Sequence, residues 1–257
     1  MPGRLAGKVA LISGSGSGIG QAIAIRYASE GASVVINYLD RPEGADETKA
    51  KAEAAGGKAI TVQGDVTKIS DTQNLVEQAY KQLGGCDILV NNAGIEKGAD
   101  FWDITEADYD AVLNVNLKGA FFLTQAFVRR LRDAKKPGRV INISSVHEDM
   151  VFPHFPTYCA AKGGLRMLMR DLAVELGPLN ITVNNIAPGA ISTPINAKMM
   201  ANKEQLEALL VNIPLGRMGT TDDVSGLAVF LASDDAAYVT GSTYVVDGGL
   251  MRNYHEQ

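Results

Sequence analysis

The sequence predicts an α/β fold in which a doubly wound parallel sheet is covered by helices on both faces. Short apolar runs alternate along the chain with longer segments of helical period, which is the pattern of such a fold. Its 257 residues are enough for one large core, so we expect a single domain over residues 1–257. Hydrophobic residues make up 46% of the chain and charged residues 21%, as is ordinary for a globular protein.

Seven apolar runs are the expected strands, at Lys8–Ser13, Ser33–Asn37, Ala59–Gln63, Ile88–Asn91, Arg139–Ile143, Ile181–Ile186 and Thr243–Val246. Helices are predicted to begin near polar residues or a proline, at Gly18, Glu43, Ser70, Thr105, Pro156 and Asp222. Residues 194–219 break the alternation and are rich in Met, Asn and Lys. This segment is expected to be a mobile insertion over a substrate cleft or a plain surface excursion.

Charge and cysteine content limit the partners. The net charge of -5 gives no overall attraction to nucleic-acid phosphates. Cys86 and Cys159 have no metal-ligand spacing, which favours reduced thiols in a cytoplasmic protein, and His147 with His154 lacks further ligands for a metal. The first apolar run is far too short for a signal or membrane segment. We therefore expect a small-molecule substrate, with no nucleic acid, membrane or metal.

A glycine-rich turn follows the first expected strand. Gly14, Gly18 and Gly20 stand there without the strict G-x-G-x-x-G spacing, and a helical apolar pattern follows. Backbone amides at such a turn can approach a pyrophosphate, which the helix N-terminus also attracts. The octapeptide alone fits a flexible turn, but its place between strand and helix favours a dinucleotide site of Rossmann type.

The coenzyme preference stays open. The second strand leads into Asn37-Tyr38-Leu39-Asp40-Arg41, with neither an acid for ribose hydroxyls nor a cation for a 2′-phosphate at its end, and both a little later. NAD and NADP are both expected. Asp65, at the end of the third strand, is placed either to hydrogen-bond an adenine amino group or to cap a turn.

Tyr158 and Lys162 are four residues apart on a predicted helix, so their side chains share one face. A phenol, with a pKa near ~10, is a poor base at neutral pH, and a nearby ammonium is expected to lower that pKa. Tyr158 is then able to take a proton from a substrate hydroxyl while hydride leaves its carbon.

This spacing is common by chance, so the prediction of catalysis rests on position. Ser145 directly follows the fifth strand, where a hydroxyl can hold a carbonyl oxygen as charge develops. Asn91-Asn92-Ala93-Gly94 closes the fourth strand at the same edge of the sheet, where ligands bind in open parallel sheets.

Through these residues the chain resembles the short-chain dehydrogenase/reductase family, from Leu5 to Gly249. The resemblance implies a nicotinamide-dependent oxidoreductase and a homotetramer. It implies a catalytic tetrad in which Asn116 joins Ser145, Tyr158 and Lys162, with Asn116 and Lys162 anchoring a water relay. The residue pattern alone leaves Asn116 as a helix-interior polar group bonding its own backbone. The expected cofactor contacts are Gly14, Ser17, Gly18, Ile19, Gly20, Tyr38, Asp65, Val66, Asn92, Ala93, Gly94, Tyr158, Lys162, Pro188, Gly189, Ile191 and Thr193.

Within the family, the segments around Glu96, Ser145 to Glu148 and Pro188 to Ala197 are most similar to bacterial glucose 1-dehydrogenases. That likeness implies oxidation of an aldose to a lactone, with sugar hydroxyls held by Glu96, Ser145, His147 and Asn196. The stretch from His147 to Asp149 also fits a solvated loop. Those enzymes commonly carry a basic residue where Leu39 stands here, which weakens a grip on a 2′-phosphate unless Arg41 substitutes.

Three alternatives differ in chemistry. A 3-oxoacyl carrier-protein reductase would use Arg129, Arg130, Arg166 and Arg170 to dock an acidic partner. A non-catalytic dinucleotide sensor would use the same scaffold, although retention of Ser145, Tyr158 and Lys162 argues against it. A hydrolase lacks a G-x-S-x-G turn.

Overall fold

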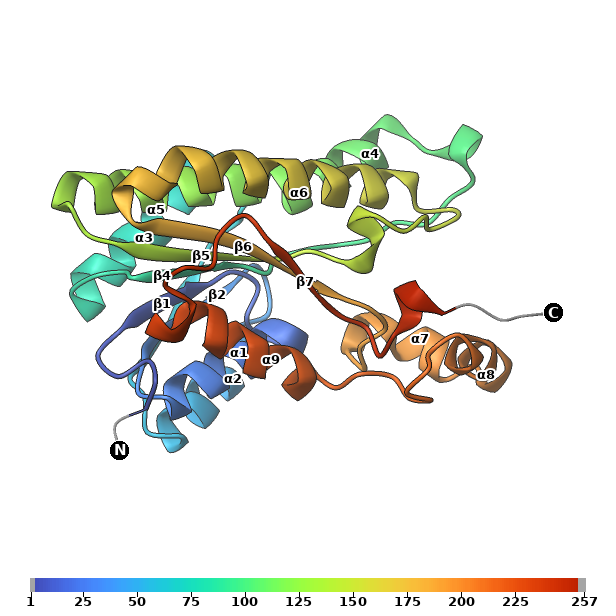
Figure 1. Ribbon diagram of the computed structural model, residues 1–257, viewed down its shortest axis with the longest axis horizontal. Coiled ribbons are helices and arrows are strands. Elements are labelled where there is room, and N and C mark those ends of the chain that lie inside the picture. The colour runs from blue at the N-terminus through green and yellow to red at the C-terminus, as the bar shows by residue number, and fades with distance from the viewer. Residues whose placement is uncertain (1–2, 254–257) are drawn as a thin grey trace.

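Residues 3–253 are described by the computed structural model, and they form one parallel sheet with helices on both faces (Figure 1). The seven strands lie in the order β3-β2-β1-β4-β5-β6-β7 and all pair in parallel. This confirms the predicted fold class. The strands are β1 Val9–Ile12, β2 Ser33–Tyr38, β3 Ala59–Gln63, β4 Ile88–Asn91, β5 Gly138–Ile143, β6 Ile181–Pro188 and β7 Thr243–Val246.

The central strands are apolar on both faces because helices cover both sides of the sheet. Successive side chains of a strand point to opposite faces. In β1, Ala10 and Ile12 join the apolar cluster under helices α1 (Gly18–Ser29) and α9 (Thr221–Ala232). Leu11 joins the cluster under α3 (Ile69–Leu83), α5 (Ala120–Ala134) and α6 (Pro156–Leu176). The chain therefore builds two cores, one on each side of a single sheet.

Helices α3 (Ile69–Leu83), α5 (Ala120–Ala134) and α6 (Pro156–Leu176) lie over one face, and α1 (Gly18–Ser29), α2 (Pro42–Ala54) and α9 (Thr221–Ala232) over the other (Figure 1). The helix predicted near Thr105 is α4 (Glu106–Leu113), which runs through a π-helical turn at Asn114–Gly119 into α5.

The span Glu106–Ala134 is long and apolar enough to cross a membrane by length and composition alone. Its apolar side is nevertheless used inside the protein, because Leu123, Phe127 and Leu131 are fully buried in the core that it shares with α3 and the sheet. A helix packed in this way is a core helix of the domain.

The segment 194–219 contains two helices that the sequence pattern does not predict, α7 (Ala197–Met200) and α8 (Lys203–Val211). Neither helix has a buried residue, which explains the weak apolar period. The two ends of the segment meet at the sheet edge, where Ser192 N donates to Gly219 O over 2.8 Å and Gly219 N donates to Ala190 O over 2.9 Å. The segment therefore leaves the sheet edge and returns to it at the same place, and backbone hydrogen bonds join its two ends.

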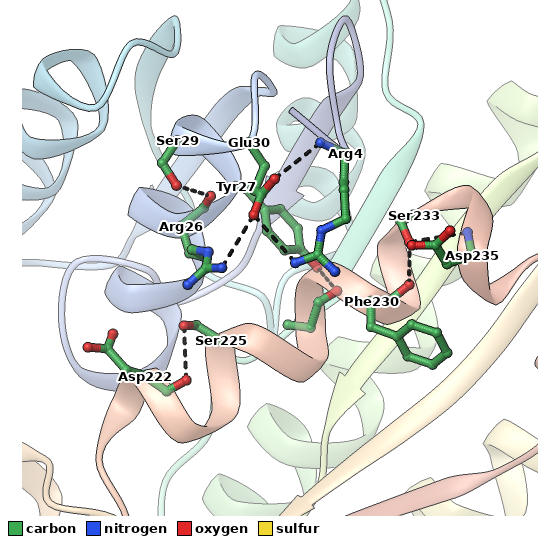
Figure 2. Close-up of polar contacts among 11 residues, drawn as sticks. Arg4, Arg26, Tyr27, Ser29, Glu30, Asp222, Ser225, Phe230, Ser233 and Asp235 are labelled. Carbon is green, nitrogen blue, oxygen red and sulfur yellow. Dashed lines mark hydrogen bonds and ion pairs between the residues drawn. The ribbon is translucent and has the colours of Figure 1, made fainter. Parts of the chain in front are cut away.

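Helices α1 and α9 are joined through Tyr27, which is fully buried between them (Figure 2). Its hydroxyl donates to the carbonyl of Ala228 over 2.9 Å. At the end of α1, Glu30 accepts from the guanidinium groups of Arg4 and Arg26, and both ion pairs are partly exposed. Burial strongly raises the pKa of Tyr27, so this phenol is neutral and acts as a hydrogen-bond donor.

Replacing Tyr27 with Phe is expected to lower the free energy of unfolding by about 1 kcal/mol, because a buried hydrogen bond is lost while the ring packing remains. Urea denaturation followed by circular dichroism measures the change. Tyr238→Phe, at a fully exposed position, is the matched control and is expected to leave the midpoint unchanged. Equal midpoints for the Tyr27→Phe variant and the wild type would contradict this account of the α1–α9 contact.

Candidate active site

The site lies at the carboxyl edge of the sheet, where the loops after β1, β4, β5 and β6 meet. Ser13 follows β1, and its hydroxyl accepts from the backbone amides of Asn92 and Ala93, both over 3.0 Å. The Asn92 side chain donates back to the carbonyls of Ser13 and Gly14 over 2.9 Å. The loop after β4 is therefore bonded to the glycine-rich turn, as expected for neighbouring parallel strands.

Asn37, at the end of β2, holds the glycine-rich turn from the other side. Its side-chain oxygen accepts from Gly14 N over 3.0 Å, and its amide donates to Gly64 O over 3.0 Å. It is only 2% exposed, so these bonds satisfy a polar group in the core. Sequence reasoning treats Asn37 only as part of the β2 end and misses this role, although an amide within an apolar strand is a signal that sequence reading can use.

The turn itself fits a dinucleotide. Gly14 has φ +61° and lies against Ala93, so a side chain there would be strained and would clash. A Cβ on Gly20 would collide with the Asn92 amide and would lie 2.8 Å from Gly14 O. At the start of α1, the side chain of Ser17 makes no capping hydrogen bond within the described chain. The first amides of α1 are then available to an anion, which is the chemistry a pyrophosphate needs.

The adenosine side of the edge is formed by the ends of β2 and β3. Leu39 and Arg41 are both exposed there. Asp65 accepts from Thr67 N over 2.9 Å and from the Thr67 hydroxyl over 2.8 Å, so it caps its own turn as in the simpler of the two interpretations. Val66 is buried against Gly119 of the π-helical turn. The geometry leaves the choice between NAD and NADP undecided.

Asn116 lies in the π-helical turn, and its side chain leaves the helix. Its oxygen accepts from Ile95 N over 2.9 Å, and its amide donates to Ile95 O over 2.8 Å. The alternative that it bonds its own helix backbone is therefore wrong. Because π-helical turns redirect side chains and often occur at functional sites, this turn explains how Asn116 reaches the loop that carries Gly94 and Glu96.

Tyr158 and Lys162 face the same side of α6, as predicted. The Lys162 ammonium lies 5.5 Å from the centroid of the Tyr158 ring and donates to Ile143 O, at the end of β5, over 2.9 Å. Ser145 is buried at the start of the short helix Val146–Glu148, where its hydroxyl accepts from His147 N over 3.2 Å. The three side chains come from adjoining segments of β5 and α6.

The expected lowering of the Tyr158 pKa by Lys162 is wrong for the protein alone. Burial raises the pKa of Tyr158 to about 12, and hydrogen bonding with the Ser145 side chain acts in the opposite direction. Burial also lowers the pKa of Lys162 to about 8. The reason is that desolvation penalises both charged forms, and Lys162 donates to a backbone carbonyl instead of the phenol.

His147 forms one wall of the site together with two aromatic side chains. Its ring stacks on Phe152 at 4.1 Å between centroids, and Phe152 stacks on Phe155 at the same distance. The His147 ring also meets Tyr158 edge-on at 6.3 Å. Sequence reasoning finds His147 but misses both phenylalanines. The only sequence signal for them is that two aromatic residues stand three positions apart, shortly after His147.

The protonation state of His147 follows from its contacts. Nδ1 lies 3.2 Å from Met150 O, so it carries the hydrogen, and burial lowers the pKa of the ring below its ordinary value. Nε2 is then an acceptor.

Glu96 lies on the loop after β4, near Tyr158. Burial raises the pKa of Glu96, and the charge of Glu96 in turn raises the pKa of Tyr158. The aromatic wall is tied to the Glu96 loop because Ala99 N donates to His154 O over 2.8 Å.

The loop after β6 completes the edge. Gly189 N donates to Val246 O over 2.9 Å, and a Cβ on Gly189 would lie 2.8 Å from the Asp247 Cβ, so Pro188 and Gly189 are packed against β7. Thr193 stands beside Gly18 of the glycine-rich turn. Asn196 donates to Ile191 O over 2.7 Å, which uses one of its amide hydrogens within the loop.

Comparison with known proteins agrees with this geometry. Residues 14–251 match the family model described as enoyl-(acyl carrier protein) reductase. The chain is 45% identical to 3beta-hydroxysteroid dehydrogenase 1 of Eggerthella lenta, over 96% of this chain and 94% of that protein. It is 38% identical to glucose 1-dehydrogenase 2 of Bacillus subtilis, over 96% of this chain and 95% of that protein.

A solved structure of gluconate 5-dehydrogenase from Burkholderia cenocepacia, in complex with NADP and tartrate, superposes with a TM-score of 0.92. It is 35% identical, with 98% of each chain covered. The chain therefore belongs to the short-chain dehydrogenase/reductase family. It is an NAD(P)-dependent oxidoreductase that acts on CH–OH groups.

Gly20→Ala is expected to weaken NADP binding by about tenfold or more, equivalent to about 1.4 kcal/mol, because the added methyl group displaces the Asn92 amide and the turn. Quenching of protein fluorescence on NADP titration measures the dissociation constant. Gly226→Ala, on α9 with no atom within 4 Å of the added Cβ, is the matched control. A folded Gly20→Ala variant with unchanged NADP affinity would remove the glycine-rich turn from the cofactor site.

Proposed function

We propose that the protein oxidises a hydroxyl of a sugar or polyol with NAD(P), most simply the C1 hydroxyl of an aldose to give its lactone. The observation that carries this proposal is the convergence of Ser145, Tyr158 and Lys162 at the carboxyl edge, beside a wall where His147 and Glu96 offer polar groups. Sugar hydroxyls need such donors and acceptors. The likeness to a glucose 1-dehydrogenase and a gluconate 5-dehydrogenase supports the same substrate class.

The proposed reaction is a two-electron oxidation. The substrate hydroxyl gives its proton to the phenolate oxygen of Tyr158, the C–H bond breaks, and a C=O bond forms. A bound oxidised nicotinamide supplies the hydride acceptor and a positive charge that favours the phenolate. The Ser145 hydroxyl donates to the substrate oxygen and holds it as the carbonyl forms. In the reverse direction Tyr158 donates the proton.

In this proposal Lys162 stabilises the deprotonated form of Tyr158, and Asn116 positions the loop beside it. Lys162 places a positive charge 5.5 Å from the phenol ring, which stabilises the phenolate once the site is closed to water. Asn116 holds the loop of Ile95 through two hydrogen bonds and so fixes Glu96 opposite the phenol. The roles assigned to the glycine-rich turn, the Asn92 loop and the Pro188 loop are to hold the cofactor.

A second candidate substrate is a flat apolar ring alcohol such as a 3-hydroxysteroid. The specific observation in its favour is the stack of His147, Phe152 and Phe155, which offers a planar apolar surface beside Tyr158. Docking of an acidic carrier protein has less support. Arg166 is paired with Asp149 at 2.8 Å, and Arg130 lies over the Tyr80 ring at 4.4 Å, so neither guanidinium is free for a partner.

We also propose that residues 194–219 act as a lid over the substrate. The support is that the segment starts at the Thr193 loop, beside the glycine-rich turn, and returns to the sheet edge at Gly219. Its two helices carry no buried residue, so their movement costs little core packing. A cytoplasmic homotetramer remains part of the same proposal, from family likeness.

Tyr158→Phe is expected to lower kcat by about 10²- to 10⁴-fold, because the proton acceptor is removed while the ring stays in place. Steady-state turnover measures this, and NADP affinity, which is expected to be retained, shows that the variant is folded. Tyr109→Phe, at an exposed position on α4, is the control. Full turnover in the Tyr158→Phe variant would refute the catalytic role and revive the non-catalytic sensor.

A steady-state screen offers D-glucose, other aldoses, gluconate and a 3β-hydroxysteroid with NAD and NADP separately, and an acetoacetyl thioester with NADH and NADPH separately. Oxidation of at least one aldose is expected. Turnover of the steroid alone would move the assignment to the apolar alcohol. Turnover of the thioester alone would move it to carrier-protein reduction.

His147→Phe sharpens the same test because it keeps a ring in the stack but removes the Nε2 acceptor. Aldose turnover is expected to fall by about tenfold or more, since one hydroxyl loses its partner, whereas turnover of an apolar alcohol is expected to hold. Unchanged aldose turnover would exclude His147 from sugar recognition.

A further inference from the structure

Glu148 is a buried carboxylate next to the catalytic residues that the proposed reaction does not use. Its side chain is 3% exposed. One oxygen accepts from the Asn185 amide over 2.9 Å, and the other accepts from the Thr243 hydroxyl over 2.6 Å. Burying a charged carboxylate costs free energy unless hydrogen bonds and an opposite charge compensate it. The groups around Glu148 must therefore supply both.

Asn185 is the end of a row of amides that crosses the sheet. Asn91, Asn142 and Asn185 occupy adjacent positions on β4, β5 and β6, and Thr243 is the next position on β7. Asn91 donates to Asn142 over 2.8 Å, and Asn142 donates to Asn185 over 2.9 Å. With Glu148, this row links four strands through side chains in the core.

Each amide of the row donates to the next member in the direction of Glu148, and Asn91 also donates to the Thr124 hydroxyl over 2.9 Å. The amide dipoles of the row therefore add, and the positive end of the chain meets the carboxylate. At the opposite end, the oxygen of Asn91 has no hydrogen-bond partner among the described residues. This orientation is what a fixed negative charge at position 148 would select.

Lys162 is a buried cation on the stretch of α6 that packs against Glu148, because the backbone oxygen of Glu148 lies 3.9 Å from the position of a Cβ on Gly163 and its carboxylate lies 3.6 Å from Arg166. The Lys162 ammonium is anchored on Ile143 O, one residue after Asn142 of the row, so the lysine and the amide row share the end of β5. Burial lowers the pKa of Lys162, and the charge of Glu148 raises it. Arg166, one turn further along α6, lies 3.6 Å from the Glu148 carboxylate and makes its short contact with Asp149 instead.

The other charged and titratable groups around Lys162 come from three segments. Helix α6 contributes Tyr158, Cys159 and Arg166. The short helix after β5 contributes His147 and Glu148 and leads into Asp149, and the loop after β4 contributes Glu96. The side chains that β5, β6 and β7 present in this row are neutral. Among these carboxylates, Glu148 has an almost completely buried side chain, and its charge raises the pKa of Lys162.

We propose that Glu148, held rigidly by the amide row, is a positioning residue that keeps Lys162 charged beside Tyr158. The importance of this charge for turnover rests on the proposed function of Lys162. A neutral amine at this position would not stabilise the phenolate of Tyr158. Glu148 thus acts on the reaction through Lys162 and without touching the substrate.

The test measures the protonation of Lys162 directly, without a substrate. In protein labelled with ¹³C at the lysine ε-carbons, the Lys162 signal is assigned by its loss in Lys162→Arg and then titrated with pH. Glu148→Gln, which keeps the size and one acceptor but removes the charge, is expected to lower the Lys162 midpoint by about one pH unit. Glu175→Gln, which removes an exposed carboxylate further along α6, is the matched control and is expected to leave the midpoint unchanged.

An unchanged midpoint in folded Glu148→Gln, or equal shifts in both variants, would overturn the proposal. Thermal melting and NADP affinity show whether the variants are folded. If Glu148→Gln does not fold, Arg166→Gln replaces it: removal of the competing cation is expected to raise the midpoint, and a fall or no change would overturn the proposal.

The consequence for the reaction is read from kcat/KM against pH with the substrate found active. The alkaline limb of the profile is expected to move to lower pH in Glu148→Gln and to stay in place in Glu175→Gln. This readout depends on the proposed function, whereas the lysine titration does not. If Tyr158→Phe keeps full turnover while the Lys162 midpoint still shifts in Glu148→Gln, the proposed function fails and the coupling of the two residues stands.

Discussion

The site depends on polar side chains that are buried at the carboxyl ends of the parallel strands. An unpaired polar group there is costly, and side chains such as Asn37 and Asn142 bond fixed partners on neighbouring segments. Among the described residues, the oxygen of Asn91 and the hydroxyl of Ser144 are the exceptions at these strand ends. Through their hydrogen bonds, Asn37 and Ser13 join the glycine-rich turn to the loops after β3 and β4. The backbone that we propose to receive the cofactor is shaped by these bonds as much as by its glycines.

Burial also determines the electrostatics of Tyr158 and Lys162, the residues that we propose to be catalytic. It raises the pKa of Tyr158 and lowers that of Lys162, so both groups are pushed toward their neutral forms. The proposed catalysis by this pair therefore needs charges from elsewhere to favour the phenolate and the ammonium. A dry site makes each such charge effective, because little solvent screens it. The exclusion of water thus explains both the free-energy cost of burying these groups and the strength of the charge effects on them.

Much of the fold follows from local pattern. The seven strands are apolar runs bounded by turns, and each is found within two residues of its expected bounds. Helices α7 and α8 are missed because they bury no residue and so carry no apolar stripe. The π-helical turn is missed because it depends on packing around Asn116. The phenylalanines of the His147 wall gain their meaning only when their rings stack.

By itself, the sequence determined the α/β class, the order of the strands along the chain, the glycine-rich turn and the four-residue spacing of Tyr158 and Lys162. These properties are local, since they depend on side-chain period and on residues close in the chain. Tertiary structure alone decided that Asn116 bonds the Ile95 loop and that Tyr158 is desolvated. It also decided that Glu148 ends a row of amides from three strands. Register and burial bring such residues together across long stretches of chain, and no local pattern encodes that contact.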